Sequence, residues 1–321
     1  MKIIGTGSAL PEKVVTNEML TQYFDTSDEW ITTRTGIKTR HLCSKETIID
    51  LGTLAAQRAI ENAGIDPQDL DYLIVSNVAN NYVSPGMGCV VQGRIGATCP
   101  TFDLNAACTG FIFALDIAES FLKTGRCKNI LVLCAEEPSK YCDWKGGDRT
   151  TSILFGDGAG AVVLTQGDDL LTIRTATKSL PDVLWYKHAM EPTPFEEGIE
   201  EHVPLQMDGK GVFRAAVTAS CNDMTAVLQA AGIAPADVDL YLLHQANLRI
   251  IQAIREHVEQ PVEKFPTNLE RYGNTSSSSI PILMDELHRA GRLKPGMTLA
   301  LSAFGAGFVS GAAILKWTLD K

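Results

Sequence analysis

The chain has 321 residues, of which 45% are hydrophobic and 21% are charged, and its formal net charge is −10 at pH 7. These values are typical of a folded globular protein. The acidic balance argues against non-specific binding to nucleic acid or to an anionic membrane surface, and the apolar runs are far shorter than the ~20 residues that span a bilayer. We therefore expect no nucleic-acid partner and no membrane segment.

The N-terminal stretch MKIIGTGSALPE predicts a first strand, because its apolar run is too short for the core of a signal peptide. Eight cysteines are scattered along the chain without a CxxC pair or a histidine spacing that is typical of zinc sites. They indicate a reducing compartment, which we take to be the cytoplasm, and we expect no metal site.

The next segment, TSDEWITTRTG, predicts a short helix that is capped by Thr26 with Glu29 and ends at Gly36. Farther along, AIENAGIDPQDLDYLIVS predicts a helix, a glycine stop, a proline turn and a buried strand. LNAACTGF then places Cys108 where a predicted strand passes into an apolar helix over residues 109–123. A cysteine in this place either packs as a small core residue or acts as a nucleophile.

The second half of the chain repeats the pattern of the first. VLQAAGIAPADVDLYLLH resembles the segment just described, and Gly232 follows Gly64 by 168 residues. Two further pairs keep the same order: SFLKTGRCKNILVL with ELHRAGRLKPGMTLAL, and FGDGAGAVVL with FGAGFVSGAAIL. Three ordered matches predict a fused duplication, with residues 1–166 and 167–321 as its halves. Helical periods that alternate with short apolar runs predict an α/β fold of mixed sheets covered by helices.

The last pair lies closer together than the first two, so the first half carries an insertion near residues 136–148, which we expect to be a functional loop. An offset of 166 residues places Asn274 opposite Cys108, each at the start of a helix. His244 closes a predicted buried strand, and we expect all three to meet. Taken singly, Asn274 is also typical of a helix N-cap, and His244 of a hydrogen-bonded core histidine.

The Cys108 elbow, HQANLRI around His244 and RYGNTSSSS around Asn274 together resemble β-ketoacyl-acyl carrier protein synthase III. The resemblance covers essentially the whole chain and includes IIGTGSALPE, TSDEWITTRTGI, DRTTSILFGDGAGA and KPGMTLALSAFGAGF. It implies the thiolase-like fold, a five-layered αβαβα sandwich made of two βα halves, and it implies a homodimer.

The resemblance implies that Cys108 accepts an acyl group from an acyl-coenzyme A and passes it to malonyl-acyl carrier protein by decarboxylative condensation, which initiates fatty acid synthesis. We expect the helix N-terminus to lower the pKa of the thiol, and the backbone N–H groups of Cys108 and Ala306 to hold the oxyanion. His244 and Asn274 would donate hydrogen bonds to the enolate that decarboxylation produces, beside the apolar ring of Phe304.

Coenzyme A enters this reaction as part of a substrate, and no cofactor is expected. The residues that match the family's contacts to it are Trp30 and Arg149 at the adenine, Arg34 at the nucleotide end, and Gly209, Phe213 and Asn247 along the pantetheine tunnel. The cationic residues expected to meet the acyl carrier protein are Lys210, Arg214 and Arg249.

One position departs from the pattern of the short-chain enzymes. In those enzymes an aromatic residue of the partner subunit closes the acyl pocket, and Ser84 stands at its position here. We therefore predict a deeper pocket and primers that are longer or more branched than acetyl, unless Tyr82 or Met87 refills the space.

Two other functions fit parts of the sequence. The same fold serves acyltransferases and condensing enzymes of secondary metabolism, which pass the acyl group to another acceptor, and no residue here excludes them. An inactive paralogue that serves as an interaction subunit would be expected to have lost Cys108, His244 or Asn274, and all three are present.

Overall fold

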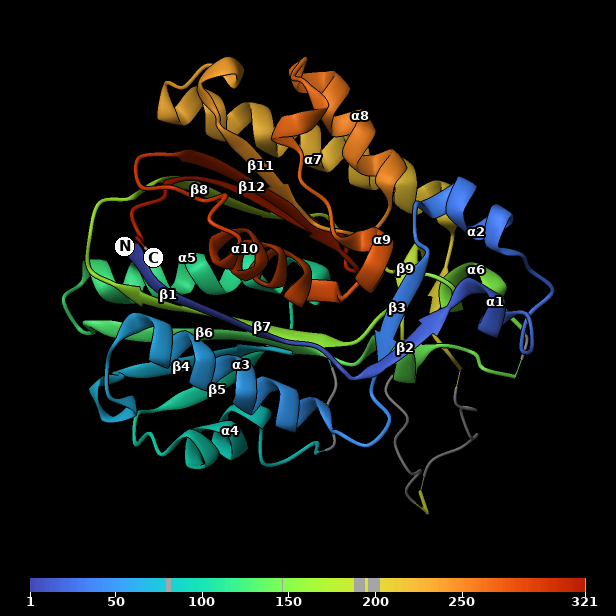
Figure 1. Ribbon diagram of the computed structural model, residues 1–321, viewed down its shortest axis with the longest axis horizontal. Helices are drawn as coiled ribbons and strands as arrows, with labels where there is room; N and C mark the ends of the chain where they lie inside the picture. The colour runs from blue at the N-terminus through green and yellow to red at the C-terminus, as the bar shows by residue number, and fades with distance from the viewer. Residues whose placement is uncertain (79–81, 146, 188–193, 196–202, 321) are drawn as a thin grey trace.

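Two large β-sheets lie face to face, and a layer of helices separates them (Figure 1). The computed structural model describes residues 1–78, 82–145, 147–187, 194–195 and 203–320. Helices also cover the outer face of each sheet, which gives five layers. The predicted α/β sandwich of five layers is therefore confirmed. None of the described helices is long and apolar enough to cross a bilayer.

The first sheet has five strands, in the order β1 (Lys2–Ala9), β7 (Gly158–Thr165), β6 (Asn129–Glu136), β4 (Tyr72–Ser76) and β5 (Thr101–Leu104). The second has four, in the order β11 (Leu240–Leu243), β12 (Thr298–Gly305), β13 (Val309–Lys316) and β8 (Leu170–Thr177). Both sheets are mixed: β4 is parallel to β5 and β6, β11 is parallel to β12, and the other neighbours are antiparallel.

The middle layer consists of α5 (Gly110–Lys123) and α10 (Ser279–Arg289). Both helices are mostly buried, because a sheet lies on either side of them. The outer layers consist of α3 (Ile48–Ala63) and α4 (Met87–Ile95) on the first sheet, and of α7 (Gly209–Ala231) and α8 (Leu248–Val258) on the second. The outer helices need one apolar face each, and α8 supplies it with Ile250, Ile251, Ile254 and Val258 at helical spacing.

The smaller elements surround the edge of the sandwich where α2 lies (Figure 1) or connect the main ones. The strands and α-helices among them are β2 (Lys13–Thr16), β3 (Thr39–Leu42), β9 (Leu184–Trp185), β10 (Gln206–Met207), α1 (Asn17–Leu20), α2 (Asp28–Thr35), α6 (Arg149–Ser152) and α9 (Leu269–Tyr272). The 3₁₀ turns are η1 (Pro67–Asp69), η2 (Ala107–Thr109), η3 (Pro138–Tyr141), η4 (Pro235–Asp237), η5 (Val262–Lys264) and η6 (Ser276–Ser278).

The helix α2 begins one residue later than predicted. Its N-cap is Ser27, whose hydroxyl accepts the N–H of Trp30 at 3.1 Å, so the prediction of Thr26 as the cap is wrong. Both residues carry a hydroxyl that can cap a helix, and the sequence alone does not choose between them. The predicted end is confirmed, since Gly36 closes the helix with φ of 84°.

The predicted repeat is visible as two runs of the same elements. α3, Gly64, η1 and β4 in the first half correspond to α7, Gly232, η4 and β11 in the second. The two glycines have φ of 66° and 65°, the left-handed conformation that favours glycine at a helix end. The predicted insertion is also present, because 21 residues separate β6 from β7 while a three-residue turn joins β12 to β13.

The central helices begin at matching tight turns. Ala107 in η2 and Ser276 in η6 have φ of 46° and 53°, which non-glycine residues rarely adopt. Matching η2 to η6 pairs Cys108 with Ser277, so the predicted pairing of Cys108 with Asn274 is wrong by three residues. A constant offset fails here because the halves differ in the length of their connections. Asn274 lies just before η6.

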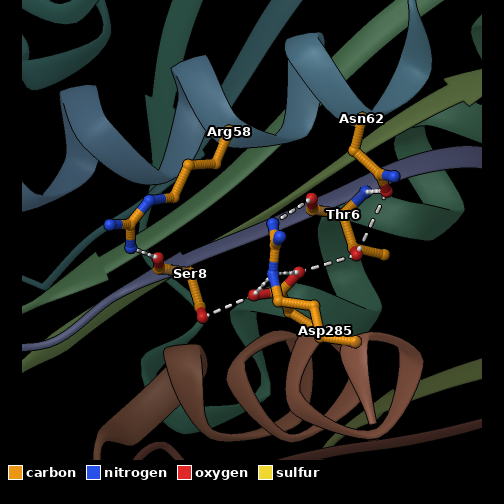
Figure 2. Close-up of polar contacts among 6 residues, drawn as sticks. Thr6, Ser8, Arg58, Asn62 and Asp285 are labelled. Carbon is orange, nitrogen blue, oxygen red and sulfur yellow. Dashed lines mark hydrogen bonds and ion pairs between the residues drawn. The ribbon is translucent and has the colours of Figure 1, made fainter. Parts of the chain in front are cut away.

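A buried carboxylate joins the middle helix α10 to the edge strand β1 (Figure 2). Asp285 accepts hydrogen bonds from Thr6 Oγ1 at 2.8 Å and from Ser8 Oγ at 2.6 Å. Arg289, one helical turn farther along, pairs with the same carboxylate at 3.0 Å. On the other side of β1, the backbone N–H of Thr6 donates to Asn62 of α3 at 2.9 Å. This network connects the two halves of the chain.

Candidate active site

The structure brings Cys108, His244 and Asn274 to the wall of one cavity of about 250 Å³. Each side chain comes from the end of a different element. Cys108 lies in η2 before α5, His244 follows β11, and Asn274 precedes η6. These three element ends meet because the two halves are packed against each other across α5 and α10 (Figure 1).

The thiol of Cys108 is held by one side chain of the other half. Ser276 Oγ lies 3.4 Å from Cys108 Sγ. Loss of hydration, together with the nearby carboxylate of Glu136, raises the pKa of the Cys108 thiol to about 12, although the hydrogen bond from Ser276 acts in the opposite direction. This direction is opposite to the predicted lowering, because burial of the thiolate outweighs the hydrogen bonds that lower the pKa. The Cys108 side chain is therefore a neutral thiol at physiological pH.

His244 is a buried histidine with unused hydrogen-bonding groups. Its backbone N–H donates to Ser302 O at 2.8 Å, which fixes the residue to the end of the second sheet. Its ring stands edge-on to Phe304, with 5.2 Å between centroids, and neither ring nitrogen has a hydrogen-bond partner in the described part of the chain. Burial lowers the pKa of His244 to about 3, so the ring is neutral at physiological pH. A buried orphan N–H facing a cavity indicates a ligand.

Asn274 is fixed by its neighbours so that its amide N–H₂ remains available. Its backbone N–H donates to Leu154 O at 2.8 Å, and its carbonyl accepts from Gly156 at 3.0 Å. Its side-chain Oδ1 accepts the backbone N–H of Ser276 at 2.8 Å. Since an N–H can donate only to the oxygen, Nδ2 is left as the donor end. Asn274 is not the N-cap of either helical element that follows, since the N-caps are Thr275 for η6 and Ser278 for α10, and its role as a hydrogen-bond donor stays a prediction.

The glycine loop after β12 lies directly behind the nucleophile. A Cβ on Gly305 would stand 2.7 Å from Cys108 N, so only glycine allows this approach. Ala306 and Cys108 line a common second cavity. Phe304, at the end of β12, lines the first cavity beside His244 and stacks on Phe308 at 5.9 Å between centroids. The predicted oxyanion and decarboxylation groups therefore surround Cys108.

Most of the predicted coenzyme A contacts line the same cavity as Cys108. These are Trp30, Arg34, Gly209, Phe213 and Asn247. Asn247 caps α8 and also donates to Arg34 O at 3.2 Å, so it holds α2 against α8. The cavity thus runs from the half-buried Cys108 to a partly exposed rim, where Phe213 is 39% exposed.

Arg149 lies at this rim but is not part of the cavity wall described above. Its guanidinium carbon is 4.5 Å from the centroid of Trp30, and that of Arg34 is 4.4 Å from the same ring. Arg149 also pairs with Asp25 at 3.6 Å. An aromatic base between Trp30 and Arg149 needs two contacts of about 3.5 Å each. Arg149 must therefore move away from the ring before a base can enter.

The three predicted carrier-protein residues are exposed side chains close to the rim. Lys210 and Arg214 lie in the first turns of α7, and Arg249 lies in the first turn of α8. Arg249 donates to Thr33 O at 3.2 Å, which leaves it anchored beside α2.

A second cavity of about 470 Å³ reaches Cys108 from another direction. It is lined by Cys108, Ser276 and Ala306, and by four aromatic side chains, Tyr141, Phe155, Trp185 and Tyr186. Tyr141 and Tyr186 are stacked, with 4.9 Å between centroids. No periodic pattern predicts that these aromatics come together, because they belong to the insertion and to the segment around β9.

The two residues predicted for the acyl pocket do not line either of these cavities. Ser84 is exposed on the segment before α4. Met87 is fully buried in the core of the first half, with Gly52 and Ala135 nearby, so the suggestion that it refills the acyl pocket is wrong. Its apolar side chain is the first of α4 and is taken up by packing against α3. Tyr82 is 49% exposed.

Sequence reasoning missed two polar residues next to the thiol, Ser276 and Glu136. Small side chains are common at the start of a helix, so the serine run after Asn274 does not by itself indicate a functional group. Glu136 could have been noticed as an acidic residue that ends the apolar run ILVLCA. Among the described residues, one group could offer three metal ligands, Cys43, Glu137 and Asp157, and none of them lines the two cavities. Asp157 already accepts hydrogen bonds from Cys43 N and from Ser139.

Known proteins are similar to this chain in both sequence and fold. Residues 102–179 match the family described as 3-oxoacyl-[acyl-carrier-protein] synthase III, and residues 228–317 match the description of its C-terminal part. A β-ketoacyl-[acyl-carrier-protein] synthase III of Clostridium acetobutylicum is 42% identical over 99% of both chains. The crystal structure of the 3-oxoacyl-[acyl-carrier-protein] synthase III from Aquifex aeolicus VF5 has a TM-score of 0.92 at 42% identity, covering 98% of this chain and 99% of that chain.

A relative from another kind of pathway is also similar. The priming β-ketosynthase of the R1128 polyketide biosynthetic pathway has a TM-score of 0.92 at 32% identity and covers 100% of this chain and 97% of that chain. The fold and the identities agree with the resemblance that the motifs suggested. This chain belongs to the 3-oxoacyl-[acyl-carrier-protein] synthase III family of acyl-transferring, thiolase-fold condensing enzymes.

Proposed function

We propose that this protein condenses an acyl-coenzyme A primer with malonyl-acyl carrier protein through an acyl-Cys108 intermediate, the reaction that starts fatty acid synthesis. The observation that supports this most directly is the cavity that Cys108, His244 and Asn274 share. We also propose that the halves 1–166 and 167–321 act as two units, the first supplying the nucleophile and the second the two donors.

In the first half-reaction, Cys108 Sγ attacks the thioester carbonyl carbon and coenzyme A leaves as a thiol. The covalent intermediate divides one difficult transfer into two easier ones. Backbone N–H groups of Cys108 and Ala306 are proposed to hold the oxyanion, since the glycine loop packs against the Cys108 backbone. Coenzyme A occupies the cavity rim at Trp30 and Arg34, and Arg149 closes over the base after it leaves the Trp30 ring.

In the second half-reaction, malonyl thioester loses carbon dioxide and its enolate carbon bonds to the acyl carbon on Cys108. The bond from that carbon to Sγ breaks, the 3-oxoacyl product leaves, and Cys108 takes up a proton from water to become a thiol again. Negative charge builds on the thioester oxygen, where a neutral His244 N–H and the Nδ2 of Asn274 donate hydrogen bonds. The ring of Phe304 next to His244 gives the departing carboxylate an apolar surrounding, which favours its loss.

The second cavity is proposed to receive the acyl chain of the primer. A water molecule takes about 30 Å³ of liquid, so a space of about 470 Å³ is far larger than an acetyl group requires. Its aromatic lining suits an alkyl chain. With a serine at position 84 in place of a closing aromatic side chain, we propose primers longer or more branched than acetyl.

The partners follow from the same surfaces. Lys210, Arg214 and Arg249 supply local positive charge on a chain of net charge −10, which suits an acidic carrier protein at the rim. We propose a homodimer, because the residue at position 84 is expected to act on the pocket of a partner subunit. The eight cysteines are all free thiols, which suits the cytoplasm.

The test is a panel of acyl-coenzyme A thioesters of increasing length and branching. Intact mass and peptide mapping should show one acyl adduct on Cys108, absent from Cys108→Ala, and a chase with malonyl-acyl carrier protein should release a 3-oxoacyl product. An adduct elsewhere would reject the assignment. A strong preference for acetyl over longer primers would reject the deeper pocket.

The polyketide relative favours one alternative, a condensing enzyme or acyltransferase of secondary metabolism that uses the same intermediate. Acylation of Cys108 without decarboxylation of malonyl-acyl carrier protein in the chase would favour this alternative acceptor.

A further inference from the structure

A buried carboxylate lies one side chain beyond the nucleophile. Glu136 is the last residue of β6 and is fully buried. Its Oε1 accepts hydrogen bonds from Ser277 Oγ at 2.6 Å and from Ser276 Oγ at 3.3 Å, and its Oε2 accepts from the backbone N–H of Val78 at 3.1 Å. Ser276 Oγ is also the atom that lies 3.4 Å from Cys108 Sγ. A continuous chain therefore runs from the thiol through Ser276 to Glu136.

The hydroxyl of Ser276 has one proton but two possible acceptors, the sulfur and the carboxylate. If it donates to Glu136, its lone pairs face Cys108 and can accept the thiol proton. If it donates to a Cys108 thiolate, the carboxyl group must carry the proton. The direction of this hydroxyl thus couples the charge of Cys108 to the charge of Glu136.

The other contacts of Glu136 leave this route open. Ser76 Oγ donates to Ser277 Oγ at 3.0 Å, so the Ser277 proton is available for Glu136. No basic side chain in the described part of the chain forms an ion pair with Glu136. The titratable groups that face it are two thiols, Cys108 from η2 and Cys134 from β6, while η6 and the segment after β4 contribute only hydroxyl and N–H groups.

We propose that Ser276 is a further catalytic residue and that Glu136 acts through it as the proton acceptor for acylation of Cys108. As Sγ bonds to the thioester carbon, the thiol proton passes to Ser276 Oγ and the Ser276 proton passes to Glu136 Oε1. When the bond from carbon to the coenzyme A sulfur breaks, the proton returns by the same two steps to the departing sulfur. Glu136 is then a carboxylate again, and no other reactant is consumed.

The electrostatics agree with this assignment. Burial raises the pKa of Glu136 to about 7, which is near the value that suits a general base at physiological pH. His244, with its pKa lowered to about 3, is a poor proton acceptor and is left as a hydrogen-bond donor for decarboxylation. The inference rests on the proposed acylation of Cys108 and adds the route of its proton.

The test compares Glu136→Gln and Ser276→Ala with a matched control, Ser278→Ala. Ser278 is a buried serine of the same turn whose hydroxyl bonds Cys134 O and Gly158 O and does not touch Glu136. Single-turnover acylation by an acyl-coenzyme A should slow by ~10²-fold or more in the first two variants and stay within a few-fold of wild type in the control. Glu136→Gln should also lose the rise of the rate with pH near neutrality.

The rate at which fully acylated protein decarboxylates malonyl thioester should change little in Glu136→Gln. A merely structural defect would lower this rate as well. The proposal would be overturned if Glu136→Gln and Ser276→Ala kept the wild-type acylation rate and pH profile. It would also be overturned if Ser278→Ala lost as much of the acylation rate as they do. If the variants do not fold, the dependence of the wild-type acylation rate on pH decides the question. The proposal requires an ionisation between pH 6 and 8 in that profile, and a profile without one would overturn it. The rate of Cys108 alkylation by iodoacetamide is then compared in the same variants, without coenzyme A. This comparison tests the proton route even if acyl-coenzyme A is not the substrate, so a failure of the proposed function is distinguished from a failure of this inference.

Discussion

His244 and Asn274 are each held in place by hydrogen bonds to the protein, and each keeps one hydrogen-bond donor that has no protein partner among the residues that the structure describes. Asn274 uses Oδ1 on the N–H of Ser276, and His244 is held through its backbone by Ser302. A donor that is already oriented needs no reorganisation when charge develops, which is why such groups stabilise transition states well.

The first prediction concerns these two donors. Asn274→Ala and His244→Ala should each slow decarboxylation by ~10²–10³-fold, because one hydrogen bond to the enolate is lost. Single-turnover acylation of Cys108 should remain within a few-fold of wild type. Because His244 stays neutral well below pH 6, wild-type decarboxylation should be flat from pH 5 to 8 once the enzyme is acylated. An equal loss of acylation in both variants would contradict this division of roles.

The second prediction concerns the stability of Glu136→Gln. An unfolded glutamate loses its proton near pH 4.5, whereas burial holds the folded pKa at about 7. Between these values the folded state binds more protons than the unfolded state, so rising pH destabilises the wild type. The variant lacks this effect, and its stability relative to wild type should increase by about 3 kcal/mol from pH 4.5 to 7 and level off above. Urea unfolding at several pH values measures it, and a difference independent of pH would contradict it.

At the scale of elements, close packing at the start of α5 positions Cys108. Gly110 follows the Cys108 turn, and a Cβ there would lie 1.8 Å from Ser76 Oγ and 3.3 Å from the Cβ of Ser277. The two elbow turns can therefore approach each other only because this residue has no side chain. The same closeness brings Ser276 to the thiol.

The third prediction follows from this contact. Gly110→Ala should destabilise the protein by about 1–3 kcal/mol and displace Cys108, so acylation should fall more than the stability change explains. The matched control is Gly93→Ala in α4, where a Cβ meets nothing within 4 Å. It should be neutral or stabilising by about 0.5–1 kcal/mol, because alanine favours a helix over glycine. Thermal unfolding and acylation rates are measured for both variants. Equal stability and equal acylation rates in Gly110→Ala and Gly93→Ala would contradict the prediction.

For the molecule as a whole, function depends on how the two halves are held together. Cys108 comes from one half, and His244 and Asn274 come from the other, so a small shift between the halves would separate the proposed nucleophile from the proposed donors. Asp285 and its partners on β1 are one polar connection across this boundary (Figure 2). The apolar core around α5 and α10 is the larger one.

The fourth prediction tests that connection. Asp285→Ala should destabilise the protein by about 2–3 kcal/mol, because the buried Thr6 hydroxyl loses its acceptor. Arg94→Ala, which removes an ion pair with Asp50 whose side chains are about half exposed, should change stability by less than about 1 kcal/mol. Denaturant unfolding measures both. An equal effect of the two substitutions would show that Asp285 contributes no more than a surface charge.

Sequence reasoning recovered the features that depend on local pattern. The helix, glycine, turn and strand around Gly64 and Gly232 recur because left-handed helix ends and buried strands have strong residue preferences. Motifs of one family predict that Cys108, His244 and Asn274 lie together, and the shared cavity confirms that placement. Errors arose where several residues satisfy the same rule, as with Ser27 and Thr26 at the start of α2.

By itself, then, the sequence determined the α/β fold of two similar halves and the meeting of Cys108, His244 and Asn274 in one cavity, because these follow from periodicity and short motifs. The tertiary structure alone decided that burial raises the pKa of the Cys108 thiol, that Met87 belongs to the core, and that Glu136 reaches the thiol through Ser276. Desolvation and contacts between residues 140 positions apart depend on how the halves pack, and no local pattern carries that information.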